Sequence, residues 1–155
     1  MLNDPEARLR DLGLELPAIP EPAGAYVPAT RAGSLLFTAG QLPFEDGELQ
    51  KTGKVGDTVS AEEAYEAARL CALNALAAAA AEAGGLNRIR RIVKVTGFVA
   101  SAPGFNSQPQ VINGASELIG ELFGEAGLHA RSAVGVAELP LDTPVEVELV
   151  AELEA

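Results

Sequence analysis

A long alanine-rich segment after Ser60 places the strongest constraint on the fold. Ser60 and Glu63 have the capping-box spacing, in which the serine side chain accepts a backbone hydrogen bond and the glutamate reaches back. Gly84 and Gly85 form a typical helix stop. Because alanine favours helix and its small side chain lets a helix lie close to a sheet, the pattern predicts one main packing helix over residues 60–83.

Two further helices are predicted around this one. Residues 108–123 carry apolar side chains at helical spacing and are followed by glycine. Near the start of the chain, Asp4 suits a helix cap, Pro5 suits the first helical position and Gly13 suits a stop. We therefore expect a short N-terminal helix on the surface of the main fold, separated from it by the proline-rich residues 17–22.

The remaining patterned segments predict strands, because they combine β-branched or apolar residues with turn residues at their ends. They are residues 25–31, 34–39, 91–100, 131–139 and 145–153. The order is β-β-α-β-α-β-β, which predicts an α/β (α+β) two-layer sandwich with a mixed sheet and two helices on one face. One chain offers no third layer for the other face, so we expect oligomerisation through the sheet.

Some details of these segments make finer predictions. In the central strand Val93, Val95 and Val99 are expected on one face. Gly97 falls on the same face and indicates either a bulge or a close approach by another element. Residues 43–58 are rich in glycine and acid and are interpreted as a surface loop.

Composition narrows the class of protein. The 155 residues suit one domain, 1–155, in which 1–20 form an N-terminal extension. The net charge of −11 opposes nucleic acid binding. The single cysteine, Cys71, lies in the alanine-rich helix and is interpreted as a small buried hydrophobe. No signal peptide and no membrane-spanning run is visible, so we expect a cytoplasmic protein with no membrane partner.

Two charged residues stand out in the last two strands. Arg131 begins a strand of small and apolar residues, and its planar guanidinium suits a carboxylate or a phosphate. Glu146 interrupts the apolar run of the final strand. If the two strands lie in one sheet, we expect the side chains of Arg131 and Glu146 to line a common cleft. The alternative is ordinary surface charge, because Glu146, Glu148 and Glu152 alternate along one face of a strand.

Four segments resemble the RidA/YjgF family. Residues 131–148, RSAVGVAELPLDTPVEVE, resemble its C-terminal signature, and residues 36–43, LFTAGQLP, resemble its strand and Gly-Gln turn. Residues 22–26, PAGAY, resemble the segment with its active-site tyrosine, and residues 93–99, VKVTGFV, resemble its central strand. All four occur in the family's order, over about residues 21–152.

The resemblance implies a chorismate-mutase-like fold, a homotrimer, and clefts between subunits. It also implies hydrolytic deamination, in which a 2-imino or enamine acid gives a 2-keto acid and ammonia without a cofactor or a metal. By resemblance, Arg131 binds the substrate carboxylate and Glu146 holds the attacking water. The resemblance further assigns substrate-binding positions to Tyr26, Gly40, Asn113 and Ala133. Whether Glu146 or Glu148 enters the cleft depends on the regularity of the final strand.

The sequence departs from the family pattern at several places. Ala133 replaces a frequent cysteine and Ala39 a frequent serine, and segments 1–20 and 43–58 are additions. The alternative hypothesis is therefore a non-catalytic trimer that binds small carboxylates or acts in regulation. An endoribonuclease activity is disfavoured by the acidic charge. The single histidine, His129, is interpreted as a polar loop residue, with at most a rim contact to Arg131.

Overall fold

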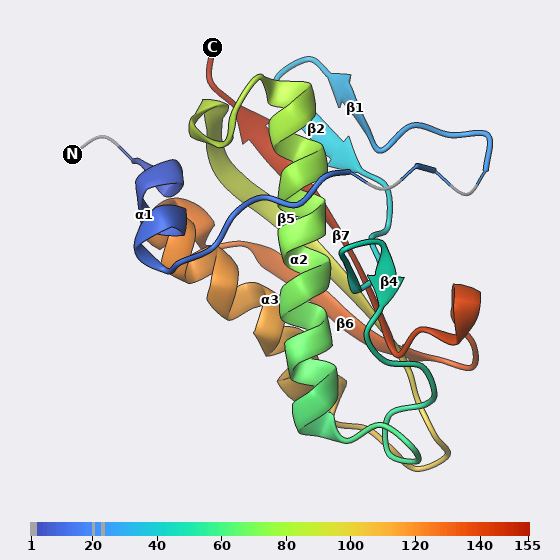
Figure 1. The fold of residues 1–155 in the computed structure, drawn as a ribbon. Helices are drawn as coiled ribbons and strands as arrows, with labels where there is room; N and C mark the ends of the chain where they lie inside the picture. Colours follow the sequence, from blue (N-terminus) through green and yellow to red (C-terminus); the bar gives the residue numbers. More distant parts are fainter. Residues whose placement is uncertain (1–2, 20, 23) are drawn as a thin grey trace.

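The computed structural model describes residues 3–19, 21–22 and 24–155, and these form a sheet covered by helices on one face (Figure 1). The five-stranded sheet has the order β1-β2-β7-β5-β6. Its strands are β1 (Ala29–Ala32), β2 (Leu35–Thr38), β5 (Ile89–Ala100), β6 (Ala130–Val136) and β7 (Val145–Leu153). Only β5 and β6 pair in parallel, and the other neighbours are antiparallel. The predicted mixed-sheet α/β sandwich is confirmed.

The helices form where the sequence predicts them. α2 (Ala61–Ala83) begins at the complete Ser60 capping box and ends at Gly84, which has a left-handed φ of 90°. α3 (Gln108–Phe123) packs beside it, and α1 (Pro5–Asp11) contacts α3 (Figure 1). The described residues also form three short 3-10 helices, at Leu86–Arg88, Gly124–Gly127 and Pro140–Asp142. No helix in the described ranges is long and apolar enough to cross a membrane.

The core lies between the helices and the sheet. In β7 every second residue from Val145 to Leu153 is buried, which places Glu146, Glu148 and Glu152 on the other face as predicted. In β5 the side chain of Ile112 from α3 occupies the space above Gly97, where an added Cβ would lie less than 3.0 Å from it. Gly97 pairs regularly with both neighbouring strands, so it marks a close approach and not a bulge.

The prediction that Val93 shares a face of β5 with Val95 and Val99 is wrong. The pairing of β5 with β7 is irregular between Ile92 and Lys94. Val93 is an extra residue in β5 that has no partner in β7, and it reverses the alternation of inward and outward side chains. Ile92 is therefore fully buried in the core, while Val93 is only half-buried. Val95 and Val99 share one face as predicted, and both are fully buried in the core.

Strand ends differ from the prediction where pairing partners are missing. β1 begins at Ala29, because Ala29 is the first residue that pairs with β2, opposite Thr38. Residue 23 of the predicted tyrosine segment and residue 20 of the proline-rich stretch lie outside the described residues. β6 ends at Val136, where its parallel pairing with β5 ends at Ala100.

The predicted loop 43–58 contains a small hairpin. β3 (Phe44–Glu45) pairs with β4 (Glu48–Leu49). Asp46 and Gly47 both have positive φ, 52° and 81°, which is the turn geometry that Asp-Gly favours between two short strands. The Asp-Gly pair was therefore the signal for this hairpin in the sequence.

The sheet face opposite α2 and α3 carries no helix of the described chain (Figure 1). It presents polar residues together with apolar ones, including Phe37, which is 40% exposed, and Val134, which is 43% exposed. A shallow hollow on this face is lined by Lys94, Thr96 and Glu148. Oligomerisation through this face remains a prediction.

Candidate active site

Arg131 lies in β6 and points toward α3. Its Nη1 donates to Asn113 Oδ1 at 2.7 Å and to Ser116 Oγ at 3.2 Å. Both acceptors are neutral, and no carboxylate among the described residues pairs with this arginine. Nη2 and Nε therefore remain available as a planar edge for an anion. The structure brings together two of the predicted site residues, Arg131 and Asn113.

Glu146 lies in β7 and lines a different pocket, of about 400 Å³, together with Tyr26 and Gly40. A Cβ at Gly40 would lie 2.8 Å from Glu146 Cδ, so the absence of a side chain there makes room for the carboxyl group. The rest of the wall is mainly apolar: Pro22, Pro28, Leu42, Phe44, Pro140 and Leu141. Three predicted site residues thus share one cavity.

Partial burial, and to a smaller extent the charge of Glu148, raise the pKa of Glu146 above its ordinary value of 4.5. A carboxylate with a raised pKa is a stronger base than a fully solvated one, so it accepts a proton from a bound water more readily. Glu148 lies two residues further along the same regular strand, at the hollow of Lys94 and Thr96. Glu146, and not Glu148, therefore lines the pocket with Tyr26.

We predict that Glu146→Gln raises the thermal unfolding midpoint near neutral pH. A folded-state pKa above the unfolded value makes burial of the ionised group unfavourable, and this penalty is absent below pH 4.5. The midpoint gain over the native protein should therefore shrink as the pH falls from neutral toward 4.5, and should be lost below that value. The exposed Glu125→Gln is the control in calorimetric scans over pH. A gain that grows on acidification would contradict the prediction.

Arg131 and Glu146 do not meet within one chain. β5 lies between β6 and β7 in the sheet. Arg131 reaches α3 on the helix-covered face, whereas Glu146 alternates with residues buried under the helices and therefore points to the opposite face. A cleft that contains both side chains thus requires two chains.

Ala133 and Ala39 lie close to these residues in the sequence, and both are half-buried. Ala133 follows Arg131 by two residues on the same side of β6, and it is half-buried opposite Gly97 of β5. Ala39 lies between β2 and Gly40 and is half-buried. Both are small, so they leave space beside the proposed ligand contacts.

Ser116 is a contact of Arg131 that the sequence did not predict, and His129 lies behind it. Ser116 Oγ lies 2.9 Å from His129 Nε2, and it also accepts the hydrogen bond from Arg131. His129 lies in the loop before β6, as predicted, and its ring nitrogens contact Ser116 and the Gly127 carbonyl oxygen, so it reaches Arg131 only through Ser116. Its two-residue spacing from Arg131 places both side chains on one side of an extended segment, and this spacing was the available signal.

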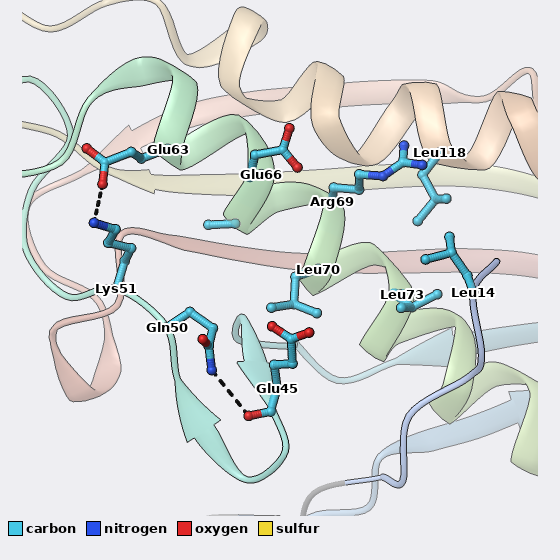
Figure 2. Close-up of a pocket in the computed structure, with 11 residues that line it drawn as sticks. Leu14, Glu45, Gln50, Lys51, Glu63, Glu66, Arg69, Leu70, Leu73 and Leu118 are labelled. Carbon is cyan, nitrogen blue, oxygen red and sulfur yellow. Dashed lines mark hydrogen bonds and ion pairs between the residues drawn. The ribbon is translucent and has the colours of Figure 1, made fainter. Parts of the chain in front are cut away.

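A larger cavity, of about 520 Å³, lies away from these residues on the outer surface of α2 (Figure 2). Its floor is leucine: Leu14, Leu70, Leu73 and Leu118. Its two cations already have partners, because Lys51 pairs with Glu63 and Arg69 with Glu121. No predicted site residue lines it, so we do not place the chemistry there.

Cys71 is fully buried between α2 and the sheet. Its burial, with a smaller contribution from the charge of Glu146, holds the pKa of the thiol well above 9.0. A thiol in this state is a poor nucleophile. The interpretation of Cys71 as a small buried hydrophobe is confirmed.

The mixed sheet with helices on one face is a chorismate-mutase-like fold. Residues 6–153 match the family described as "YjgF/chorismate_mutase-like, putative endoribonuclease". The chain therefore belongs to the RidA/YjgF family, as the four sequence segments predict.

Similar proteins span nearly the whole chain. Protein TCP17 of Trypanosoma cruzi is 45% identical over 148 residues, covering 95% of this chain and 92% of its own. The crystal structure of Atu1372 from Agrobacterium tumefaciens, a protein of unknown function, is 48% identical, with a TM-score of 0.89 and coverage of 97% and 92%. The 2-iminobutanoate/2-iminopropanoate deaminase of Salmonella typhimurium is 34% identical over 134 residues, covering 85% and 90%.

Proposed function

We propose that this protein hydrolyses 2-imino acids to 2-keto acids and ammonia in clefts between the subunits of a homotrimer in the cytoplasm. The observation that carries the proposal is the orientation of Arg131. Two neutral acceptors on α3 hold one nitrogen of its guanidinium, and the remaining edge faces no carboxylate of the described chain. A substrate carboxylate matches that edge in shape and charge. The name of the Salmonella relative supports the reaction class.

The proposed chemistry needs little more than positioning. The imine carbon is already electrophilic, so a water held by Glu146 can add to it without strong activation. The water oxygen bonds to C2, the C=N π electrons move to nitrogen, and Glu146 receives the water proton. Transfer of that proton to nitrogen gives a carbinolamine with a hydroxyl and an amino group on C2. Glu146 then takes the hydroxyl proton and passes it to the amino nitrogen, so the C–N bond breaks, ammonia leaves and the C2 oxygen becomes the keto oxygen. The raised pKa of Glu146 suits both proton transfers.

The positions of the two charged residues support the proposed subunit arrangement. Arg131 and Glu146 lie on opposite faces of the sheet with β5 between their strands. We infer that Arg131 of one subunit faces the pocket of Glu146, Tyr26 and Gly40 in the next. The sheet face without helices supplies the surface for this assembly, because it exposes Phe37 and Val134.

The test is hydrolysis of freshly formed imines. An amino-acid oxidase generates imines in situ from several amino acids, and semicarbazide competes with the native protein to trap them. We expect the protein to lower semicarbazone formation and to speed keto-acid release, relative to heat-denatured protein. A native trimer that accelerates hydrolysis of none of these imines would exclude the deaminase.

The second candidate is a trimer that binds small carboxylates without turnover. It is favoured by Ala39 and Ala133, which offer neither a hydroxyl nor a thiol beside the proposed ligand contacts. Calorimetric titration with 2-keto acids separates the candidates. Tight binding together with absent turnover would establish the binding trimer, and absence of both would exclude each of them.

A further inference from the structure

Behind Arg131 lies a chain of hydrogen bonds that the proposed reaction does not use directly. His129 Nδ1 lies 2.6 Å from the carbonyl oxygen of Gly127. A carbonyl oxygen only accepts, so Nδ1 carries a proton. In a neutral ring Nε2 is then the acceptor, and the Ser116 hydroxyl donates to it across 2.9 Å. The lone pairs of Ser116 Oγ are left to receive Arg131 Nη1 at 3.2 Å.

We propose that Ser116 and His129 are positioning residues that fix the guanidinium of Arg131 for a carboxylate ligand. This inference rests on the proposed function, since it assumes that Arg131 receives a carboxylate. His129 fixes the direction of the Ser116 proton, and Ser116 in turn presents oxygen to the arginine. His129 acts only through Ser116 and is separated from the ligand by two hydrogen bonds.

The geometry explains why two acceptors are needed on α3. Asn113 and Ser116 are three residues apart and therefore lie on one face of the helix. Together they hold Nη1 from two directions, which restricts rotation of the guanidinium plane. The opposite edge, Nη2 and Nε, then keeps a fixed orientation for bidentate binding. With Asn113 alone, one hydrogen bond leaves the plane free to turn.

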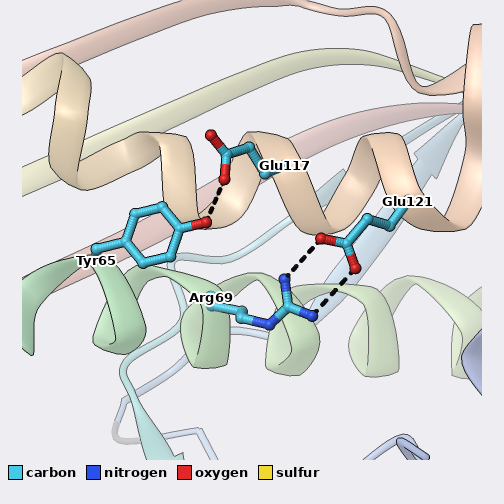
Figure 3. A network of polar contacts seen from close by, with 4 residues as sticks. All are labelled: Tyr65, Arg69, Glu117 and Glu121. Carbon is cyan, nitrogen blue, oxygen red and sulfur yellow. Dashed lines mark hydrogen bonds and ion pairs between the residues drawn. The ribbon is translucent and has the colours of Figure 1, made fainter. Parts of the chain in front are cut away.

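The helix that carries these acceptors is itself held in place. On the outer surface, Tyr65 donates to Glu117, and Arg69 donates to both carboxylate oxygens of Glu121 at 3.2 Å (Figure 3). These contacts join α2 to α3 on the outer surface, whereas Asn113 and Ser116 reach β6. The platform for Arg131 is thus fixed independently of the hydrogen bonds that we assign to positioning.

The first test reads the imidazole directly. Because the chain has a single histidine, ¹⁵N-histidine labelling of tag-free protein gives one pair of ring signals. We expect the spectrum of a neutral ring protonated at Nδ1 at neutral pH, and a shift of the Nε2 signal in Ser116→Ala. A ring protonated at Nε2, or an imidazolium, would overturn the proposed direction of the chain. This readout does not depend on turnover.

The second test measures whether the chain serves ligand binding. For Ser116→Ala we expect Kd for 2-keto acids and KM for imines to rise roughly tenfold, with kcat within about twofold, because one hydrogen bond to a charged group is lost. Ser116→Thr keeps the hydroxyl and should restore both constants. Ser34→Ala, which removes an exposed turn hydroxyl, is the matched control.

A double-mutant cycle separates this mechanism from a local structural effect. His129→Ala should weaken binding alone but add nothing to Ser116→Ala, because it acts through that hydroxyl. Additive effects, or an unchanged Kd in both single variants, would overturn the inference. If native protein turns over imines while these variants match it, the positioning role fails and the deaminase stands. If native protein binds no keto acid and shows no turnover, the proposed function fails, and the positioning role with it.

Discussion

Arg131→Ala is expected to lower kcat/KM for imine hydrolysis by about 100-fold to 10,000-fold. The substitution removes two charge-assisted hydrogen bonds to the substrate carboxylate, each contributing roughly 1.5–3 kcal/mol. It also leaves Asn113 and Ser116 without their common donor. Initial rates in the semicarbazide competition assay give kcat/KM, and calorimetry with 2-keto acids gives the accompanying loss of affinity.

Two controls define this result. Arg131→Lys keeps the charge but presents a point donor instead of a planar fork, so its activity should lie between those of the native protein and the alanine variant. Arg10→Ala removes an exposed arginine of α1 and should leave turnover unchanged. An Arg131→Ala protein with native affinity for keto acids would show that the carboxylate binds elsewhere.

Gly114→Ala is expected to destabilise the fold by about 3 kcal/mol or more, near the upper end of overpacking effects. Gly114 lies where α3 crosses α2, and a Cβ there would come closer than 3.0 Å to the backbone carbonyl oxygen of Tyr65. Backbone cannot turn aside as a side chain can, so the helices must separate. That movement would also disturb the contacts of Tyr65 and Arg69 with α3 (Figure 3).

Gly120→Ala is the matched control on the same helix. A Cβ at Gly120 meets nothing within 4 Å, so alanine there should stabilise by up to about 1 kcal/mol through helix propensity. Urea unfolding followed by far-ultraviolet circular dichroism measures both variants. If Gly114→Ala unfolds at the same urea concentration as the native protein, the close approach of α2 and α3 is wrong.

The helices and most of the core could be predicted from the sequence because their signals are local. The capping box at Ser60, the stop at Gly84 and the alternation in residues 145–153 each depend on neighbouring residues alone. Where a local irregularity intervened, the prediction failed. The irregular pairing at Val93 cannot be read from a run of β-branched residues, and it moved Ile92 into the core.

The site was harder to predict because it depends on the order of the strands and on the face of the sheet to which each side chain points. Segments 131–139 and 145–153 are consecutive in sequence, which suggests neighbouring strands, but β7 inserts between β2 and β5 while β6 pairs with β5 in parallel. Arg131 pairs with Val95 and Glu146 with Phe98, an odd number of residues apart along β5, so the two side chains point to opposite faces. Sequence resemblance selected both residues, whereas the three-dimensional arrangement shows that they lie on opposite faces of one sheet, which is the reason that we propose a cleft between subunits.

The most direct test of the shared cleft is subunit complementation. Arg131→Ala and Glu146→Gln are each expected to be inactive, but a mixed trimer contains interfaces with an intact Arg131 from one chain and an intact Glu146 from the other. Random mixing should make about one quarter of the clefts complete, and imine hydrolysis should recover to about that fraction of the native rate. No recovery in a mixture whose mixed trimers are verified by native mass spectrometry would contradict the account.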